Sequence, residues 1–200
     1  MRGKVLDFKT KFLITAISIA VISVTMSTSF PTEGKTVSVI EPNHAHIASA
    51  HCLALNIYHE ARDQGTAGIF GVTAVVLNRV NDGRFPNTIC EVVYQGPTRE
   101  SWKTRRFKNL PADERIYYPV KNKCQFSWYC DWKNDTPHNK RKYQEILDLV
   151  KGILYNEVPF VDITDGALFY HADYVNPSWA KTKQRTTEID DHIFYRWDTK

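Results

Sequence analysis

Glu60 is the residue best placed for acid–base chemistry, because its carboxyl group stands in an otherwise apolar helical pattern. On a helix with roughly 100° per residue, Leu53, Ile57 and Glu60 fall within about 60° of one another. The glutamate therefore points toward residues that should be buried. Burial disfavours the charged carboxylate and raises its pKa toward neutrality, as a general acid at neutral pH requires. A helix-capping or surface glutamate beside Arg62 is the ordinary alternative.

A metal site is the rival explanation for this segment and for the cysteines. His59-Glu60 does not continue to a His-Glu-x-x-His zinc motif, because Asp63 occupies the position of the second histidine. The cysteines lack the paired Cys-x-x-Cys spacing of structural zinc sites, and thiols of exported proteins tend to oxidise. We therefore expect no metal and no other cofactor.

The elements around Glu60 are predicted to be helical. The helix that carries Glu60 begins near Ser49, and residues 66–80 form a second helix that packs across it. Thr88 and Glu91 have capping-box spacing, which predicts a short helix from that point. Small and apolar residues share one face of the second helix, where another helix can approach closely: Gly68, Gly71, Val72 and Val75.

The second half of the chain changes in character. Residues 140–155 read as an amphipathic helix, and the last 45 residues are rich in aromatic side chains but have little helical periodicity. Residues 162–166 predict a turn, and residues 167–171 an extended segment. No internal repeats are visible. The pattern predicts one mainly α domain of the α+β class.

Blocks of sequence from Leu53 to Trp197 match one known family in order: LALNIYHEAR (53–62), GVTAVVLNRV (71–80), FPNTIC (85–90), CQFSW (124–128), GALFYH (166–171), PSW (177–179) and HIFY (192–195). They resemble the SleB-type cell wall hydrolases, relatives of the spore cortex-lytic enzyme. The resemblance implies a lysozyme-like, mainly helical fold and cleavage of peptidoglycan glycan strands. It also implies that Glu60 is the catalytic glutamate.

The mechanism expected from this resemblance uses one carboxyl group. Glycosidases usually need two, but Asp63, Asp131, Asp165 and Glu188 all stand in loops or at helix ends. A lytic transglycosylase can work with Glu60 alone. The acid protonates the departing glycosidic oxygen, and the carboxylate then accepts the proton of the muramic acid 6-hydroxyl, which closes a 1,6-anhydro ring.

Three alternatives stay open beside this mechanism. Muramidase-type hydrolysis by water would use the same Glu60. A non-catalytic peptidoglycan-binding protein would keep the aromatic residues but would not need a buried glutamate. An amide-cleaving wall enzyme would need a zinc site or a Cys/His nucleophile, which this sequence does not assemble.

Candidate substrate contacts come from the matched blocks. Aromatic faces pack on the C–H surfaces of sugars, although most aromatic residues belong to a core. The substrate-binding candidates are Phe126, Ser127, Trp128, Tyr170, His171, Trp179, His192 and Tyr195. His171 and His192 could equally be buried, hydrogen-bonded imidazoles.

Four cysteines in an exported chain suggest disulfides, and four cysteines allow three pairings. Cys124 and Cys130 bracket a small loop that carries three aromatic residues. A bond between them would close this loop and would leave Cys52 to pair with Cys90.

Residues 1–30 are predicted to be a signal peptide or a signal anchor. Four basic residues precede residues 12–26, an uncharged run that is short for a transmembrane span of about 20 residues. Residues 31–48 read as a tether, and residues 49–200 as the hydrolase domain. Export to the periplasm or another extracytoplasmic space follows in either case, with membrane contact through the N-terminal segment only.

Charge argues against general nucleic-acid binding. The net charge of +4 comes mostly from residues 1–30, so the remaining chain is nearly neutral. We expect peptidoglycan glycan strands as the partner, and no obligate protein partner. Residues 99–123 are the exception, because they hold eight basic and three acidic residues. They are either a solvated surface excursion or a basic lip over an anionic wall polymer.

Overall fold

The computed structural model describes residues 44–197, which lie within the second of two units of the chain, residues 1–39 and 40–200. The predicted signal or anchor segment and most of the predicted tether are outside the described residues. Within residues 44–197, no helix is long and apolar enough to cross a membrane.

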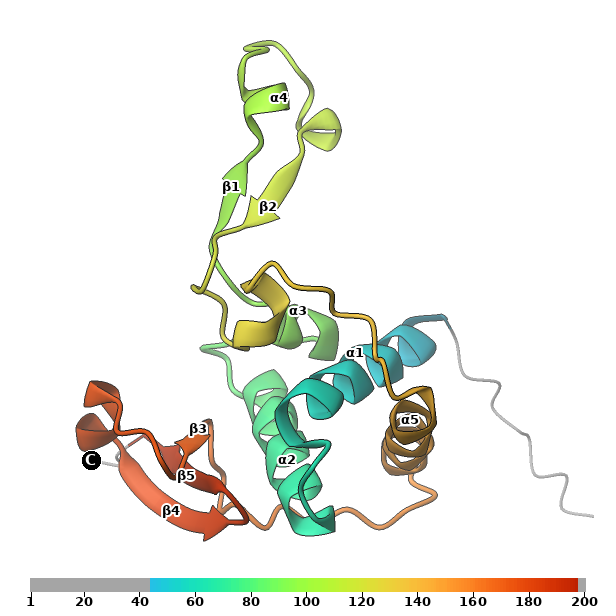
Figure 1. The fold of residues 1–200 in the computed structure, drawn as a ribbon, viewed down its shortest axis with the longest axis vertical. Helices are drawn as coiled ribbons and strands as arrows, with labels where there is room; N and C mark the ends of the chain where they lie inside the picture. Colours follow the sequence, from blue (N-terminus) through green and yellow to red (C-terminus); the bar gives the residue numbers. More distant parts are fainter. Residues whose placement is uncertain (1–43, 198–200) are drawn as a thin grey trace, which may run out of the picture. The chain divides into compact units, whose positions relative to one another are not determined.

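Helix α1 (His44–Ala61) is the centre of the helical part and packs against α2 (Thr66–Asn81), α3 (Ile89–Val93) and α5 (Lys140–Leu154) (Figure 1). The helix begins earlier than the predicted Ser49. Its first turn is exposed, so no burial pattern marks it in the sequence. Side chains from all four helices form the main core, among them Leu53, Ile57, Tyr58, Val72, Val76, Val92, Ile146 and Val150.

Capping at the start of α3 confirms the prediction made from Thr88 and Glu91. The backbone N–H of Glu91 donates to the Thr88 hydroxyl oxygen at 3.3 Å, and that hydroxyl donates to the Glu91 carboxylate at 2.7 Å. This pairing satisfies one of the free N–H groups at the helix start. The predicted helices at residues 66–80 and 140–155 are also present, each within one residue of its predicted end.

A three-stranded antiparallel sheet closes the chain, with strand order β3-β5-β4. Its strands are β3 (Phe169–Ala172), β4 (Gln184–Ile189) and β5 (His192–Arg196). The turn predicted at residues 162–166 is present and ends with Gly166 at φ +72°. The extended segment predicted just after it corresponds to β3. Together the helices and sheets confirm the α+β class.

The face of α2 that carries Gly68 and Gly71 packs against this sheet. The expectation that this face packs against another helix was wrong. A side-chain carbon at Gly71 would lie only 2.6 Å from the Phe194 ring of β5. Near the start of α2, the backbone N–H groups of Gly65 and Gly68 both donate to the Asp190 carboxylate, at 3.1 and 3.0 Å. The sheet is thereby attached along one side of α2.

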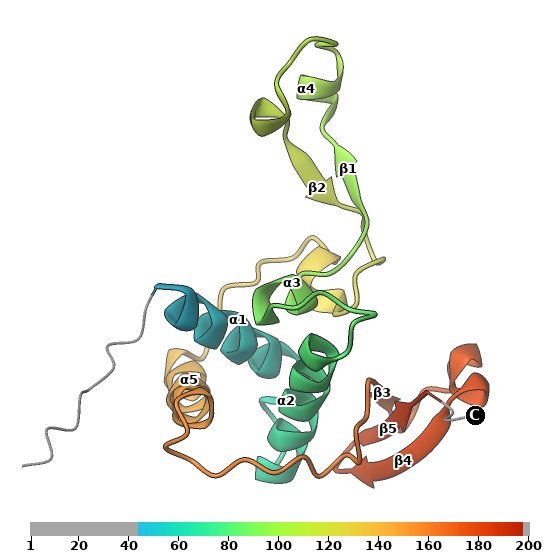
Figure 2. The same ribbon diagram turned by 180° about the vertical axis from the view of Figure 1, so that it is seen from behind.

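A hairpin carries the basic segment away from the helices (Figures 1 and 2). Its strands β1 (Thr98–Glu100) and β2 (Tyr117–Pro119) pair antiparallel. Between them lie α4 (Trp102–Arg105) and the short helix η1 (Ala112–Glu114). We call residues 97–121 the arm.

Both expected disulfides are present. Cys52 of α1 is bonded to Cys90 of α3, which joins two core helices. Cys124 is bonded to Cys130 and closes the loop below the arm that contains the short helix η2 (Ser127–Cys130).

Candidate functional site

Glu60 lies in the last turn of α1, where the helix meets the sheet. Its Oε2 accepts a hydrogen bond of 2.9 Å from the Tyr170 hydroxyl of β3. Leu53 and Ile57, on the same side of the helix, are fully buried, whereas Glu60 keeps part of its surface exposed. The carboxyl group therefore sits at the edge of the core, with one side open to solvent.

The surroundings of Glu60 raise its pKa above the ordinary value. Burial is the largest cause, and the hydrogen bond from Tyr170 and the charge of Arg79 oppose it in part. The pKa of Tyr170 is raised well above its usual value, first by burial and then by the neighbouring carboxylate. Tyr170 is therefore a hydrogen-bond donor to Glu60 across the physiological pH range.

Arg79, near the end of α2, is a site residue that the sequence analysis missed. It is 4% exposed, and its guanidinium lies 5.2 Å from the ring centres of both Phe85 and Phe126. Its Nε donates to the Leu168 carbonyl at 2.8 Å, while its Nη1 is buried without a hydrogen-bond partner among the described residues. The sequence did indicate that Arg79 is on the buried face of α2. It follows Val72 by seven residues, a spacing that places both side chains on one helix face, and Val72 is buried.

The charges of Arg79 and Glu60 act on each other without a direct contact. Burial lowers the pKa of Arg79 to about 10, and the charges of Tyr170 and Glu60 oppose that change. Arg79 therefore stays protonated at neutral pH. No hydrogen bond or ion pair joins Arg79 to Glu60 within residues 44–197. Its effect on the carboxyl group is purely electrostatic.

A chain of aromatic contacts continues from Tyr170 across the sheet. The His192 ring packs against Tyr170 with ring centres 4.7 Å apart, and its Nδ1 lies 3.1 Å from the amide oxygen of Gln64. Since an amide oxygen only accepts, Nδ1 carries the proton. Burial lowers the pKa of His192, so its imidazole is neutral at neutral pH.

His171, Tyr195 and Trp179 form a second aromatic group on the opposite face of the sheet from Tyr170 and His192, because successive side chains of a strand point to opposite faces. His171 Nδ1 lies 2.8 Å from the Ala172 carbonyl, so this nitrogen is the donor, and Nε2 lies 3.0 Å from the Tyr195 hydroxyl oxygen. The Trp179 ring, from the short helix η3 (Ser178–Thr182), packs edge-on against Tyr195. Five of the eight predicted substrate contacts thus lie on or beside the sheet, but only Tyr170 and His192 share the face that reaches Glu60.

The remaining three come from the loop that Cys124 and Cys130 close. Phe126 is 2% exposed and Trp128 is 7% exposed, whereas Ser127 is exposed. Phe126 packs under the Arg79 guanidinium. Trp128 donates its indole N–H to Asn56 at 3.0 Å and stacks on His59, with ring centres 4.6 Å apart. Both rings thus support α1 and α2 beside the carboxyl group.

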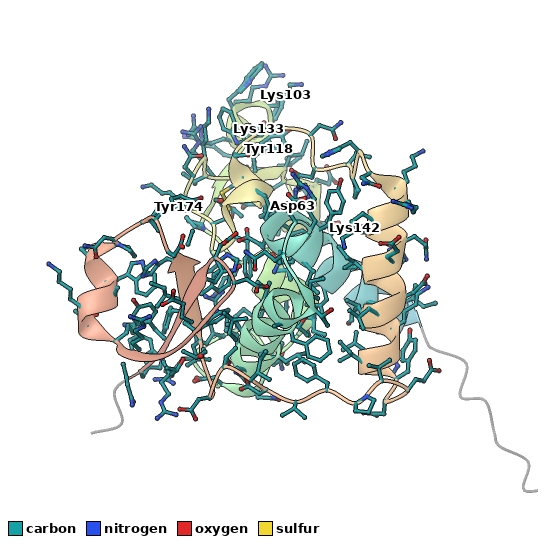
Figure 3. The ribbon with its side chains drawn as sticks, turned by 60° about the horizontal axis from the view of Figure 1, so that its bottom comes forward. Asp63, Lys103, Tyr118, Lys133, Lys142 and Tyr174 are labelled. Atoms are coloured by element: carbon teal, nitrogen blue, oxygen red, sulfur yellow. A yellow bond between two sulfur atoms is a disulfide. The ribbon has the colours of Figure 1, made fainter. Side chains whose placement is uncertain are left out.

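The other acidic candidates have partners of their own. Asp63 is 87% exposed and pairs with Arg62 (Figure 3), Asp165 pairs with Arg196, and Glu188 pairs with Arg185. Asp131 accepts from the backbone N–H of Lys133 at 2.8 Å. In the part of the chain that the structure describes, none of these four carboxylates contacts Glu60. No group of three or more histidine, cysteine, aspartate or glutamate side chains is arranged there to hold a metal ion.

Comparison with known proteins places the chain in a family. The Cell Wall Hydrolase family matches residues 63–195, a range that begins just after Glu60. The spore cortex-lytic enzyme of Bacillus cereus is 28% identical over 154 residues, 76% of this chain and 46% of that protein. The enzyme of the same name from Oceanobacillus iheyensis is 26% identical over 162 residues, 80% of this chain and 46% of that protein. The chain thus spans about half the length of these relatives.

Two solved structures are also similar. The catalytic domain of the Bacillus cereus SleB protein is 26% identical with a TM-score of 0.44, and the match covers 78% of this chain and 94% of that one. The catalytic domain of the germination-specific lytic transglycosylase SleB from Bacillus anthracis is 24% identical with a TM-score of 0.46, and it covers 78% and 100%. On the family match, which extends over more than half of its length, this chain belongs to the cell wall hydrolase family, as its resemblance to SleB-type enzymes predicted.

Proposed function

We propose that this chain cleaves peptidoglycan glycan strands and that Glu60 protonates the departing glycosidic oxygen. One observation carries the proposal: the Glu60 carboxyl group has a raised pKa and accepts a hydrogen bond from a tyrosine, on a residue that is only partly buried. A raised pKa keeps the acid protonated closer to neutral pH, where it can act as a donor. The chain's relatives are spore cortex-lytic enzymes, and cortex lysis requires cleavage of wall material.

The Tyr170 contact distinguishes the two oxygens of Glu60. The Tyr170 hydroxyl donates to Oε2, and the carbonyl oxygen of a carboxylic acid is a better acceptor than its hydroxyl oxygen. We therefore expect the acid proton to reside on Oε1. Oε1 is the atom that we expect to face the glycosidic oxygen.

After donation, Glu60 is a carboxylate that can accept a proton. The hydrogen bond from Tyr170 and the charge of Arg79 both stabilise this form. We propose that it takes the proton of the muramic acid 6-hydroxyl, whose oxygen bonds to the anomeric carbon as the glycosidic bond breaks. The product is a 1,6-anhydro end, and Glu60 returns to its acid form. One carboxyl group thus serves both steps, as in a lytic transglycosylase.

Hydrolysis is the second candidate. In that case the Glu60 carboxylate would remove a proton from water, and the released end would be a reducing sugar. Each of the other four acidic candidates is held by a partner of its own in residues 44–197, which favours the reaction that needs Glu60 alone, since most hydrolases use a second carboxylate. A purely binding protein would not need a carboxyl group whose charged form is destabilised.

We further propose that the substrate lies beside Glu60 on the sheet face of Tyr170 and His192, with Ser127 of the loop as a further contact. His171, Trp179 and Tyr195, on the opposite face, would then support the sheet. Phe126 and Trp128 would also have a supporting role, with Phe126 holding Arg79 and Trp128 holding α1 in position. Residues 1–30 would export the domain and take no part in the chemistry. Formation of both disulfides is consistent with an extracytoplasmic protein.

Mass spectrometry of the fragments released from purified sacculi tests the reaction. We expect Glu60→Gln to lower cleavage by about 10²–10⁴-fold, because glutamine keeps the shape but cannot donate the proton. Asp63→Asn removes an exposed carboxylate three residues away and is the matched control, with activity near wild type. Anhydro products identify the transglycosylase, whereas reducing ends identify the hydrolase. Wild-type cleavage by Glu60→Gln would falsify the assignment.

A further inference from the structure

The arm contributes a pocket of its own, separate from Glu60. A cavity of about 840 Å³ lies where the arm meets the loop that follows Cys130. Its walls include three aromatic side chains, Trp102 of α4, Tyr118 of β2 and Trp132 of the loop. It is lined by none of the residues assigned above to acid–base chemistry or to the sheet.

The aromatic rings of this pocket are exposed rather than packed in a core. Trp102 and Trp132 are each 64% exposed, and Tyr118 is 54% exposed. All three rings thus keep more than half of their surface in contact with solvent. Several exposed aromatic rings around one hollow are the usual mark of a binding site.

Cationic groups surround the same rings. Arg99, Lys103, Arg105 and Lys121 line the pocket, and none of them forms an ion pair within residues 44–197. The Lys121 ammonium lies 5.1 Å from the centre of the Trp132 ring. These charges therefore remain available to an anionic ligand.

The one acidic side chain in the pocket wall is already neutralised. Glu100 forms an ion pair of 2.7 Å with Arg115. In the register of the hairpin, Arg99 lies opposite Tyr118, whereas Glu100 lies opposite Tyr117. Since successive side chains of a strand point to opposite faces, Glu100 borders the pocket from the face opposite to Tyr118, with its charge held by Arg115. The face with Tyr118 is left with unpaired positive charge.

The pocket is held in shape by the loop beneath it. The Asn122 N–H donates to the Cys130 carbonyl at 3.0 Å, and the Cys124–Cys130 disulfide closes the loop just before Trp132. Across the base of the arm, the Val120 N–H donates to the Pro97 carbonyl at 2.9 Å. These bonds join the base of the arm to the loop that leads to Trp132.

We propose that this pocket is a second binding site for peptidoglycan, remote from the cleavage site. Sugar rings stack on Trp102 and Trp132, and carboxylates of the stem peptides pair with the surrounding lysine and arginine side chains. A flat anionic membrane would contact protruding groups, whereas these rings line a hollow. The inference rests on the proposed function, because it takes the same polymer as the ligand. The arm would hold the insoluble wall while Glu60 acts on a neighbouring part of the strand.

Sedimentation of the full-length protein with purified sacculi tests this site. All variants carry Glu60→Gln, so binding is measured without cleavage and does not depend on the proposed reaction. We expect Trp102→Ala combined with Trp132→Ala to weaken binding about tenfold, as the loss of two stacking contacts implies. Lys103→Glu combined with Lys121→Glu should weaken binding and reduce its dependence on salt.

Matched controls are available away from the arm. Tyr174 is 84% exposed and lies well apart from Lys103 and Tyr118 (Figure 3), so Tyr174→Ala removes an exposed ring without touching the pocket. Lys140→Glu, at the start of α5, reverses a charge elsewhere. Both should bind sacculi like the parent. Wild-type binding by the pocket variants would overturn the proposal. Pocket variants that bind sacculi normally but no longer bind vesicles of anionic phospholipid would also overturn the proposal. That result would identify a membrane site instead.

Discussion

Replacing Gly71 with alanine tests how the fold holds the site, because Gly71 is where β5 approaches α2. The added methyl carbon would lie 2.6 Å from Phe194 Cζ, and ordinary contacts begin at 3.4 Å. Phe194 is fully buried, so its ring cannot swing into solvent to make room. The strand must shift by several tenths of an ångström, or the ring must leave its preferred rotamer.

Two effects of this substitution oppose each other. Overpacking of a core costs about 1–3 kcal/mol, whereas alanine in place of glycine inside a helix stabilises it by about 1 kcal/mol. Gly71→Ala should therefore lower the free energy of unfolding by up to about 2 kcal/mol. For a domain of this size each kcal/mol corresponds to about 2–4 °C in Tm.

The site should respond as well. The Phe194 ring packs against Tyr170 with ring centres 5.7 Å apart, so a displaced Phe194 moves the hydroxyl that holds Glu60. Cleavage of sacculi by Gly71→Ala should fall even at temperatures where the protein is fully folded. Urea denaturation gives the stability, and a turbidity assay gives the activity.

A double-mutant cycle isolates the contact. In a Phe194→Leu background the shorter side chain leaves room for the methyl group, so Gly71→Ala should stabilise that variant by about 1 kcal/mol through helix propensity alone. If Gly71→Ala changed the free energy of unfolding in the same direction in both backgrounds, the reasoning would be refuted. A stabilised, fully active Gly71→Ala protein would show that Phe194 does not transmit the contact to Tyr170.

Three further predictions concern the carboxyl group and the cross-link beside it. Tyr170→Phe removes a hydrogen bond that lowers the pKa of Glu60, so the alkaline limb of the pH–activity profile should move to higher pH, and a move to lower pH would contradict this. A raised pKa of Glu60 in the folded state contributes stability in acid that is lost as pH rises through that pKa. Glu60→Gln should therefore raise Tm relative to wild type at neutral pH but not in acid, and a rise in Tm seen only in acid would contradict this. Removing the Cys52–Cys90 bond, which spans 38 residues, should cost about 4 kcal/mol in urea denaturation, and an unchanged stability would show that it constrains little.

The helices were predictable because their buried residues recur at a fixed spacing in the sequence. The periodicity of residues 66–80 and 140–155, and the cap at Thr88, are local signals. The start of α1 was not predictable, since its first turn is exposed and carries no such signal. The same reason applies to the arm, whose short elements are held by the hairpin pairing rather than by burial.

Strands β4 and β5 were missed for a different reason. The segment of β4, QRTTEI, has no alternation of apolar residues, and its side chains are only partly buried or exposed. Its structure depends on pairing with β5, which in turn pairs with β3 across the sheet. Such nonlocal pairing leaves little trace in the local pattern of any one strand.

The candidate site was predicted in part. Glu60 followed from its inward direction, and Tyr170 from its place in a matched block, but the contact between them joins residues 110 positions apart in the chain. Arg79 could have been found, because a charged residue on the buried face of α2 needs a partner or a function. The small residues Gly68 and Gly71 lie on the same face as this one charge.

The placement of Arg79 suits the reaction proposed above, in which Glu60 is first the acid and then the base. Burial is the larger influence on Glu60 and keeps the acid form available, while the charge of Arg79 makes the carboxylate less costly once the proton has left. A direct ion pair would have favoured the carboxylate so strongly that little acid remained at neutral pH. Without the arginine, the buried carboxylate would have only Tyr170 to stabilise it before it accepts the second proton. Arg79 is itself buried and is held by the rings of Phe85, Phe126 and Phe169 and by the Leu168 carbonyl. It therefore has few alternative positions relative to Glu60. The phenylalanine rings around Arg79 therefore act on the carboxylate indirectly, through the position at which they hold the guanidinium.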